Sequence, residues 1–143
     1  MTAQTFPTAS PVESDPVISK KHLWAGRVVS GLAALFFLMD GVMKLFKPAV
    51  VVEATRQLGY PESDIVGIGV VLLVCTLLYL FPRTSILGAI LLTGYLGGAV
   101  AAQVRIGAPL FSTVLAPIYV ALFLWGGLYL RDERVRAVVP VRR

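Results

Sequence analysis

The stretch WAGRVVSGLAALFFLMDGVMKLF, residues 24–46, decides the fold, because it is an apolar run that carries two opposite charges near its end. About 20 apolar residues at about 1.5 Å rise cross a hydrocarbon core of about 30 Å, so this run is long enough to span a membrane. Asp40 and Lys44 lie four residues apart within it. An ionised side chain at mid-bilayer costs roughly 2.5 to 3.5 kcal/mol, and such charges usually face a partner, a cavity or water. The pair therefore predicts where a site lies.

Three more apolar runs of similar length follow, and we predict membrane spans at residues 24–46, 65–81, 85–104 and 109–130. The runs are apolar on all sides, whereas a helix on the surface of a soluble protein shows a polar stripe. The chain has 143 residues, of which 57% are hydrophobic, so one compact unit is expected. We predict an all-α integral membrane four-helix bundle, with residues 23–131 as its membrane domain.

A short helix on the membrane surface is predicted between the first two spans. Val51, Ala54 and Leu58 recur there at helical spacing among polar residues. Pro48 suits the start of a helix and Gly59 suits its end. Outside the membrane domain, we expect residues 1–22 to form a disordered tail and residues 132–143 to form a basic tail.

The distribution of basic residues predicts the orientation of the chain. Four spans place both chain ends and the turn around Arg83 on one side, which then holds nine of the 13 Lys and Arg residues. These nine are Lys20, Lys21, Arg27, Arg83, Arg131, Arg134, Arg136, Arg142 and Arg143. By the positive-inside rule both termini are cytoplasmic. The formal charge of +5 is explained by this orientation, and no nucleic-acid partner is expected.

Aromatic side chains support the same orientation. Trp24, Tyr79, Trp125 and Tyr129 all fall near the predicted cytoplasmic ends of the spans. Amphipathic rings prefer the interface between membrane and water. We therefore expect all four side chains at the cytoplasmic interface.

Small residues form one face of the third span and predict close helix packing there. They are Gly94, Gly97, Gly98 and Ala102. The partner is another helix of the same chain, a second copy of the chain or another membrane protein. In the fourth span, Pro117 predicts a kink, because proline removes one hydrogen bond from a helix.

Polar residues of three spans converge in the outer half of the membrane and predict a pocket that opens there. The candidate polar site consists of Asp40, Lys44, Gln103, Arg105 and Thr113. The alternative is structural. Lys44 then extends to the outer headgroups with Asp40 as its counter-ion, and Arg105 is an interfacial anchor.

The sequence contains no motif for catalysis, for a cofactor or for a metal. His22 is the only histidine and precedes the first span, so a haem held by two histidines is excluded. Cys75 is the only cysteine, which excludes an internal disulfide and a cysteine cluster for metal. Any redox chemistry must come from a partner or from a diffusible quinone.

Four stretches together resemble the DoxX-like family of small bacterial membrane proteins. They are FFLMDGVMKLFKP (36–48), QLGYPES (57–63), PRTSILGAILLTGYLGGAVAAQVRIGAPLFS (82–112) and LWGGLYLRDERVRAVVP (124–140). The resemblance implies a four-helix bundle in the bacterial plasma membrane, with signatures at Asp40, Gly41 and Lys44, at Gly59, Tyr60 and Pro61, and at Gly97 and Arg105. Relatives often have a histidine where this chain has Gln103. The family is linked to subunits of thiosulfate:quinone oxidoreductase.

Two functions remain open, and a third is less favoured. The first is a non-catalytic subunit or scaffold of a membrane complex, redox-related as the resemblance implies. The second is an outer-leaflet site for a quinone or another lipophilic molecule, where Lys44 or Arg105 bonds the polar head and Asp40 tunes the charge. A transporter is less favoured, because four helices without a repeat offer little for alternating access.

Overall fold

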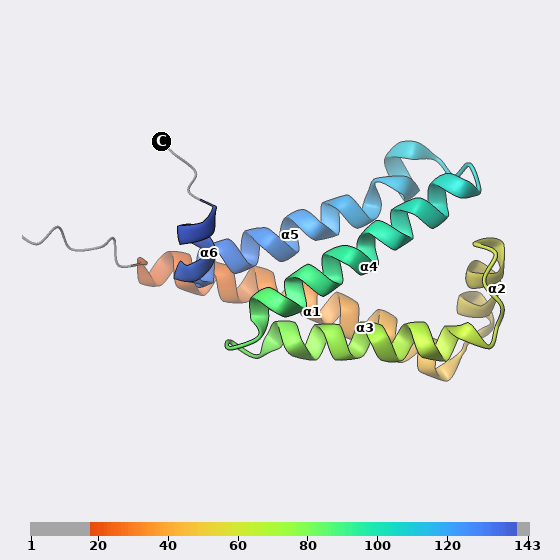
Figure 1. Ribbon diagram of the computed structural model, residues 1–143, viewed down its shortest axis with the longest axis horizontal. Helices are drawn as coiled ribbons and strands as arrows, with labels where there is room; N and C mark the ends of the chain where they lie inside the picture. Colours follow the sequence, from red (N-terminus) through yellow and green to blue (C-terminus); the bar gives the residue numbers. More distant parts are fainter. Residues whose placement is uncertain (1–17, 140–143) are drawn as a thin grey trace, which may run out of the picture.

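The computed structural model describes residues 18–139, and every regular element in this range is helical. The long helices are α1 (Lys20–Phe46), α3 (Asp64–Leu80), α4 (Ser85–Arg105) and α5 (Ala116–Arg131), the last preceded by a π-helical turn, η1 (Leu110–Val114). The short helices α2 (Ala49–Gln57) and α6 (Glu133–Val138) lie at opposite ends of the molecule (Figure 1). The predicted all-α bundle and the short helix between the first two spans are confirmed.

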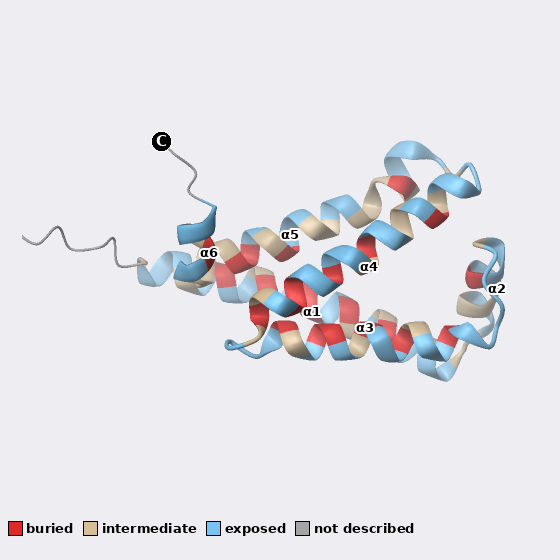
Figure 2. Cartoon of the chain, in the orientation of Figure 1, coloured by how far each residue is buried: buried red, intermediate tan, exposed pale blue. Residues whose placement is uncertain are grey.

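Three helical segments are long and apolar enough to cross a membrane, namely Lys20–Phe46, Ser85–Arg105 and Leu110–Arg131. The fourth, α3, is also apolar but has 17 residues, which at about 1.5 Å per residue span about 25 Å. A bilayer accommodates such a short helix by local thinning. Many large apolar residues are exposed, as at Leu122 and Phe123, which are 67% and 63% exposed. Exposed positions lie along the outer faces of the helices (Figure 2). This surface suits contact with lipid.

The four long helices form a closed ring in cross-section. Helix α1 packs against α3 and α5, and α4 packs against the same two helices. The described chain ends lie together at one end, which we call the closed end (Figure 1). Toward the other end α3 and α4 diverge, and α2 lies there. We call this the open end.

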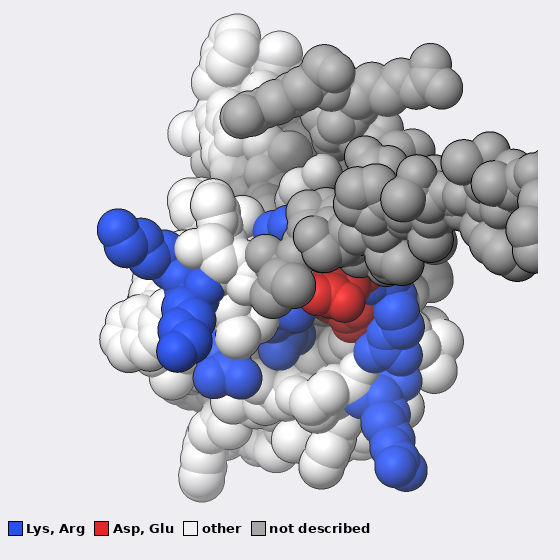
Figure 3. Space-filling model, turned by 90° about the vertical axis from the view of Figure 1, so that its left-hand side faces the viewer, with Lys and Arg blue, Asp and Glu red and all other residues white. Residues whose placement is uncertain are grey.

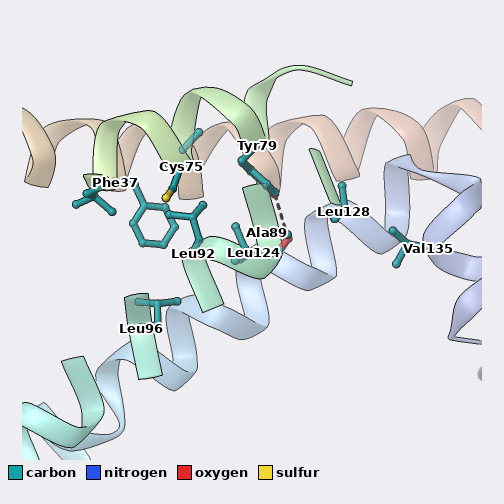
Figure 4. Packing of buried hydrophobic residues seen from close by; sticks show 11 residues of the cluster. Phe37, Cys75, Tyr79, Ala89, Leu92, Leu96, Leu124, Leu128 and Val135 are labelled. Carbon is teal, nitrogen blue, oxygen red and sulfur yellow. Dashed lines mark hydrogen bonds between the residues drawn. The ribbon is translucent and has the colours of Figure 1, made fainter. Parts of the chain in front are cut away.

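Tyr79 is the centre of the closed end. Its side chain is fully buried, and its hydroxyl lies 3.0 Å from Ser30 Oγ. It also lies 3.0 Å from the Leu124 carbonyl oxygen (Figure 4). These bonds join α3 to α1 and α5. The guanidinium of Arg131 lies 4.9 Å from the ring centroid and donates to the Tyr79 carbonyl oxygen at 3.1 Å. The hydroxyl of Tyr79, which we predict near the cytoplasmic interface, thus finds its partners inside the bundle.

Helix α4 approaches α3 so closely that one position needs glycine. A Cβ atom built on Gly88 would collide with the backbone nitrogen of Tyr79 and would lie 2.5 Å from its Cα. The neighbouring core residues Ala89 and Leu92 are fully buried in the same contact. The α3–α4 hairpin is therefore tight at the closed end.

The segment after α5 is docked against the bundle. Val135 of α6 is 4% exposed and belongs to the core cluster (Figure 4). Arg134 donates to the carbonyl oxygen of Pro82, in the α3–α4 turn, at 2.7 Å. Residues 133–138 of the predicted basic tail thus form a short helix that packs on the bundle. The predictions for residues 1–17 and 140–143 lie outside the described residues.

Asp132 links α5, α6 and the start of α4. Its carboxylate pairs with Arg134 at 3.1 Å and accepts a hydrogen bond from Ser85 Oγ at 3.4 Å. Burial alone raises the pKa of Asp132, but the side-chain and backbone hydrogen bonds from Arg134 outweigh it and hold the pKa below its usual value. The carboxylate is therefore ionised near neutral pH and holds the docked segment in place.

Basic side chains surround the closed end, where the chain ends lie (Figure 3). Those described at this end include Lys20 and Lys21 of α1, Arg83 of the turn, and Arg134 and Arg136 of α6. This agrees with the charge distribution from which we predict a cytoplasmic location for both termini. That orientation stays a prediction.

We expect Tyr79→Phe to lower the free energy of unfolding by about 0.5 to 1.5 kcal/mol, because Ser30 Oγ and the Leu124 carbonyl lose their shared partner. The matched control is Tyr119→Phe. Tyr119 is 47% exposed, and its hydroxyl makes no hydrogen bond within residues 18–139. Unfolding in mixed micelles titrated with a denaturing detergent measures both. Equal stabilities of the two variants would contradict the role given to Tyr79.

Candidate functional site

The open end contains a cavity of about 810 Å³ that is lined by residues of α1, α2, α3 and α4. Most of the residues that line it are apolar or glycine. Three charged residues line it, Asp40, Lys44 and Asp64. Four hydroxyl-bearing residues line it as well, Thr55, Tyr60, Ser63 and Tyr95. Pockets for small molecules commonly have volumes of about 300–1,000 Å³, with apolar walls and few polar groups, so this cavity has the size and chemistry of a ligand site.

The ion pair of α1 lies in the wall of this cavity. Lys44 Nζ donates to Asp40 Oδ1 at 2.5 Å. The Lys44 side chain is 15% exposed and the Asp40 side chain is 36% exposed, so the carboxylate is the more open of the two. Helix α3 covers the stem of the lysine, because a Cβ atom on Gly69 would lie 2.8 Å from Lys44 Cβ. Lys44 therefore runs along α1 to its partner and does not extend away from the protein.

Arg105 supports the wall of the cavity without lining it. Its guanidinium donates to the Leu58 carbonyl oxygen at the end of α2 and lies 6.0 Å from the Tyr60 ring centroid. Gly59, between these two residues, has φ +82°, and a Cβ atom there would collide with the guanidinium. The arginine thus fixes α2 and Tyr60 against the end of α4. This also confirms Gly59 as the residue that ends the short helix.

Two residues of the predicted polar site lie apart from the cavity. Gln103 and Thr113 are half-buried and are not among the residues that line it. The Thr113 hydroxyl lies 3.3 Å from Ser112 Oγ within η1. The structure therefore brings Asp40 and Lys44 together, places Arg105 beside them at the rim, and leaves out Gln103 and Thr113. Pro117 lies in the first turn of α5, directly after the π-helical turn, so the helix changes geometry where a kink is predicted.

The glycine face of α4 does not pack within the described part of the chain. A Cβ atom on Gly94, Gly97 or Gly98 would meet no atom within 4 Å. Gly98 and Ala102 line the cavity, and Ala102 is 7% exposed. Within residues 18–139, these glycines therefore do not pack against another helix of the same chain. Contact with a second copy or another protein stays a prediction.

Tyr95 is the main residue of the cavity that reasoning from the sequence missed. It lines the same cavity as Asp40. The signal was available, because Tyr95, Gly98, Ala99 and Ala102 follow the spacing of one helical face. A tyrosine on a face of small residues indicates space in front of it.

Metal chemistry has no support in this site. Within residues 18–139, no three His, Cys, Asp or Glu side chains group closely enough to hold a metal ion. The arrangement instead offers an apolar space with a few hydrogen-bonding groups on one wall. It suits binding of a molecule with an apolar body and a polar head.

The sequence matches the DoxX-like family over residues 28–127, a range that includes α1 from Val28, α2, α3, α4 and most of α5. No curated protein and no solved structure matches the chain.

We expect Gly59→Ala to destabilise the open end more than Gly107→Ala does. Both glycines have positive φ, +82° and +68°, so an alanine at either position is strained by about 1–2 kcal/mol. Only at Gly59 does the new Cβ also displace the Arg105 guanidinium, whereas at Gly107 it meets no atom within 4 Å. Thermal unfolding of both variants in detergent measures the difference. Equal losses would show that the contact between Arg105 and the end of α2 contributes nothing.

Proposed function

This chain belongs to the DoxX-like family, and from that premise we propose that it binds a lipophilic small molecule in the cavity at the open end of its membrane bundle. The observation that carries the proposal is the cavity of about 810 Å³, whose apolar walls surround the ion pair of Asp40 and Lys44. Sites for small molecules combine apolar walls of this kind with a few polar groups that hold the head of the ligand.

The ion pair supports a binding role in a second way. Ionised groups within membrane segments are costly and are mostly retained where they contact a substrate, an ion or a partner. Here the pair is accessible from the cavity, since the Asp40 side chain is 36% exposed and both residues line it. The apolar body of a ligand packs on the walls while its head meets the pair.

The walls also support access from the bilayer. Gly67 of α3 and Gly98 of α4 line the cavity, and a Cβ atom on either would meet no atom within 4 Å. The two helices diverge at this end of the bundle (Figure 1). A molecule dissolved in lipid reaches the cavity by the space between them. With both termini in the cytoplasm, the cavity lies in the outer half of a bacterial plasma membrane.

A quinone with a short alkyl tail is one ligand of this class and a practical probe. Its ring matches the apolar walls, and its oxygen atoms form hydrogen bonds. The chain contributes binding, and any electron transfer belongs to a partner enzyme.

We expect Gly98→Leu to weaken binding of this quinone by tenfold or more, because the leucine side chain fills the cavity and its opening. The matched control is Gly126→Leu on α5, an exposed position where a Cβ atom also meets no atom within 4 Å, outside the cavity. Equilibrium dialysis of the quinone against protein in lipid nanodiscs measures the affinity. Wild-type affinity in Gly98→Leu would rule out this cavity as the site.

The second candidate function is a subunit of a membrane complex. The observation that favours it is the unpacked glycine face of α4, because Gly94 and Gly97 leave a smooth surface open to another helix. Lipid also fits such a surface, so the face alone does not identify a protein partner.

Purification from native membranes in mild detergent distinguishes this second candidate. If the chain is a subunit, we expect it to co-purify with its partner protein. We expect Gly94→Leu or Gly97→Leu to release the partner, because the leucine side chain blocks close approach of the two helices. Gly31→Leu is the matched control, because Gly31 is an exposed glycine of α1 with no atom within 4 Å of its Cβ position. Recovery of the wild-type chain without any partner would count against the subunit.

A further inference from the structure

We propose that the cavity selects lipophilic molecules whose polar head donates a hydrogen bond, such as phenols and alcohols, and that Asp40 receives this bond. The inference rests on the proposed function, because it names the class of ligand for the same cavity. It reverses the roles expected from the sequence, where a basic side chain bonds the head and the carboxylate only tunes the charge.

Asp40 is the polar group of the ion pair that a ligand meets first. Its side chain is 36% exposed against 15% for Lys44. An ionised carboxylate only accepts hydrogen bonds, and its two oxygens offer about four acceptor positions. Lys44 Nζ occupies one oxygen at 2.5 Å, so positions on the carboxylate stay open toward the cavity.

Two of the hydroxyl groups that line the cavity already donate within the protein. Thr55 Oγ1 already donates to the Val51 carbonyl oxygen at 2.7 Å, and Ser63 Oγ donates to Asp64 at 3.1 Å. Tyr95 lines the same cavity as Asp40. Thr55 and Ser63 therefore present mainly their oxygen lone pairs to a ligand.

The basic groups near the cavity are occupied as well. Lys44 points at Asp40 and is mostly covered, and Arg105 donates to the Leu58 carbonyl oxygen outside the lining. Tyr60 stands at the rim with the Arg105 guanidinium 6.0 Å from its ring centroid. The polar wall therefore offers Asp40 as an open acceptor, and a head that donates a hydrogen bond gains a bond there that a head that only accepts does not.

A matched pair of probes tests this inference. 4-Octylphenol and 4-octylanisole have the same ring and tail, but only the phenol has an O–H group. We expect the wild-type protein in nanodiscs to bind the phenol about tenfold more tightly than the anisole, because a hydrogen bond to a buried charge contributes about 1.5 kcal/mol or more. Equilibrium dialysis, corrected for partition of each probe into nanodiscs without protein, gives the two affinities.

Variants then locate the acceptor. Asp40→Asn keeps the shape of the side chain but removes its charge, and we expect the preference for the phenol to fall to about threefold or less. Glu53→Gln makes the same change on the exposed face of α2, outside the cavity, and leaves the preference unchanged. The melting temperature of each variant, measured without a probe, shows whether the variant is folded. The comparison of the two probes on the wild-type protein does not depend on any variant.

The outcomes separate the two proposals. If both probes bind with equal affinity, or the anisole binds more tightly, the cavity binds lipophiles and the preference for a donor is wrong. An unchanged preference in Asp40→Asn also overturns the assignment to this carboxylate. If neither probe nor the quinone binds, the proposed function fails together with the inference.

Discussion

The buried hydroxyl of Tyr79 is the interaction on which the closed end of the bundle depends. It joins three helices through Ser30 Oγ and the Leu124 carbonyl oxygen, each 3.0 Å away. The fourth helix fits against the backbone of the same residue through Gly88, and Arg131 covers its ring. Hydrogen bonds between helices in lipid contribute only about 0.6 to 2 kcal/mol each, so their weight here comes from convergence on one side chain. This junction lets the opposite end diverge while the bundle stays together.

The cavity is the consequence of that divergence. At the open end the small residues of α4 face space, and α2 is held across this end through the contact of Arg105 with Leu58 and Tyr60. The ion pair of α1 is tolerated because Lys44 and Asp40 satisfy each other and face this space. The ion pair of α1, the small residues of α4 and helix α2 thus all contribute to the cavity, although they lie in different parts of the chain.

The membrane helices and the position of the ion pair could be predicted because both follow from the cost of polar groups in lipid. The length of an apolar run identifies a span, and Asp40 and Lys44 identify the polar wall without any knowledge of packing. Gln103 and Thr113 could not be placed in the same way, because depth in the membrane is readable from sequence but rotation of a helix about its axis is not. They share the depth of the cavity and still do not line it.

Tyr79 and α6 escaped prediction for a different reason. A tyrosine near the end of a span suits the interface and the core equally well, and only the partners of its hydroxyl decide between them. The sequence of α6 is short and highly charged, so it suggests a tail, but a single apolar residue, Val135, is enough to dock it once Arg134 finds the Pro82 carbonyl. Both depend on contacts between residues about 50 positions apart.

The junction at Tyr79 has a consequence for the order in which the protein is made. Ser30 lies in α1, Tyr79 in α3 and the Leu124 carbonyl in α5, so these groups leave the ribosome in this order. Until α5 enters the bilayer, the hydroxyls of the earlier helices lack their final acceptor in a medium without water. The nascent chain therefore assembles its closed end only when synthesis of the membrane segments is complete, and the earlier helices depend on the insertion machinery or on each other until then.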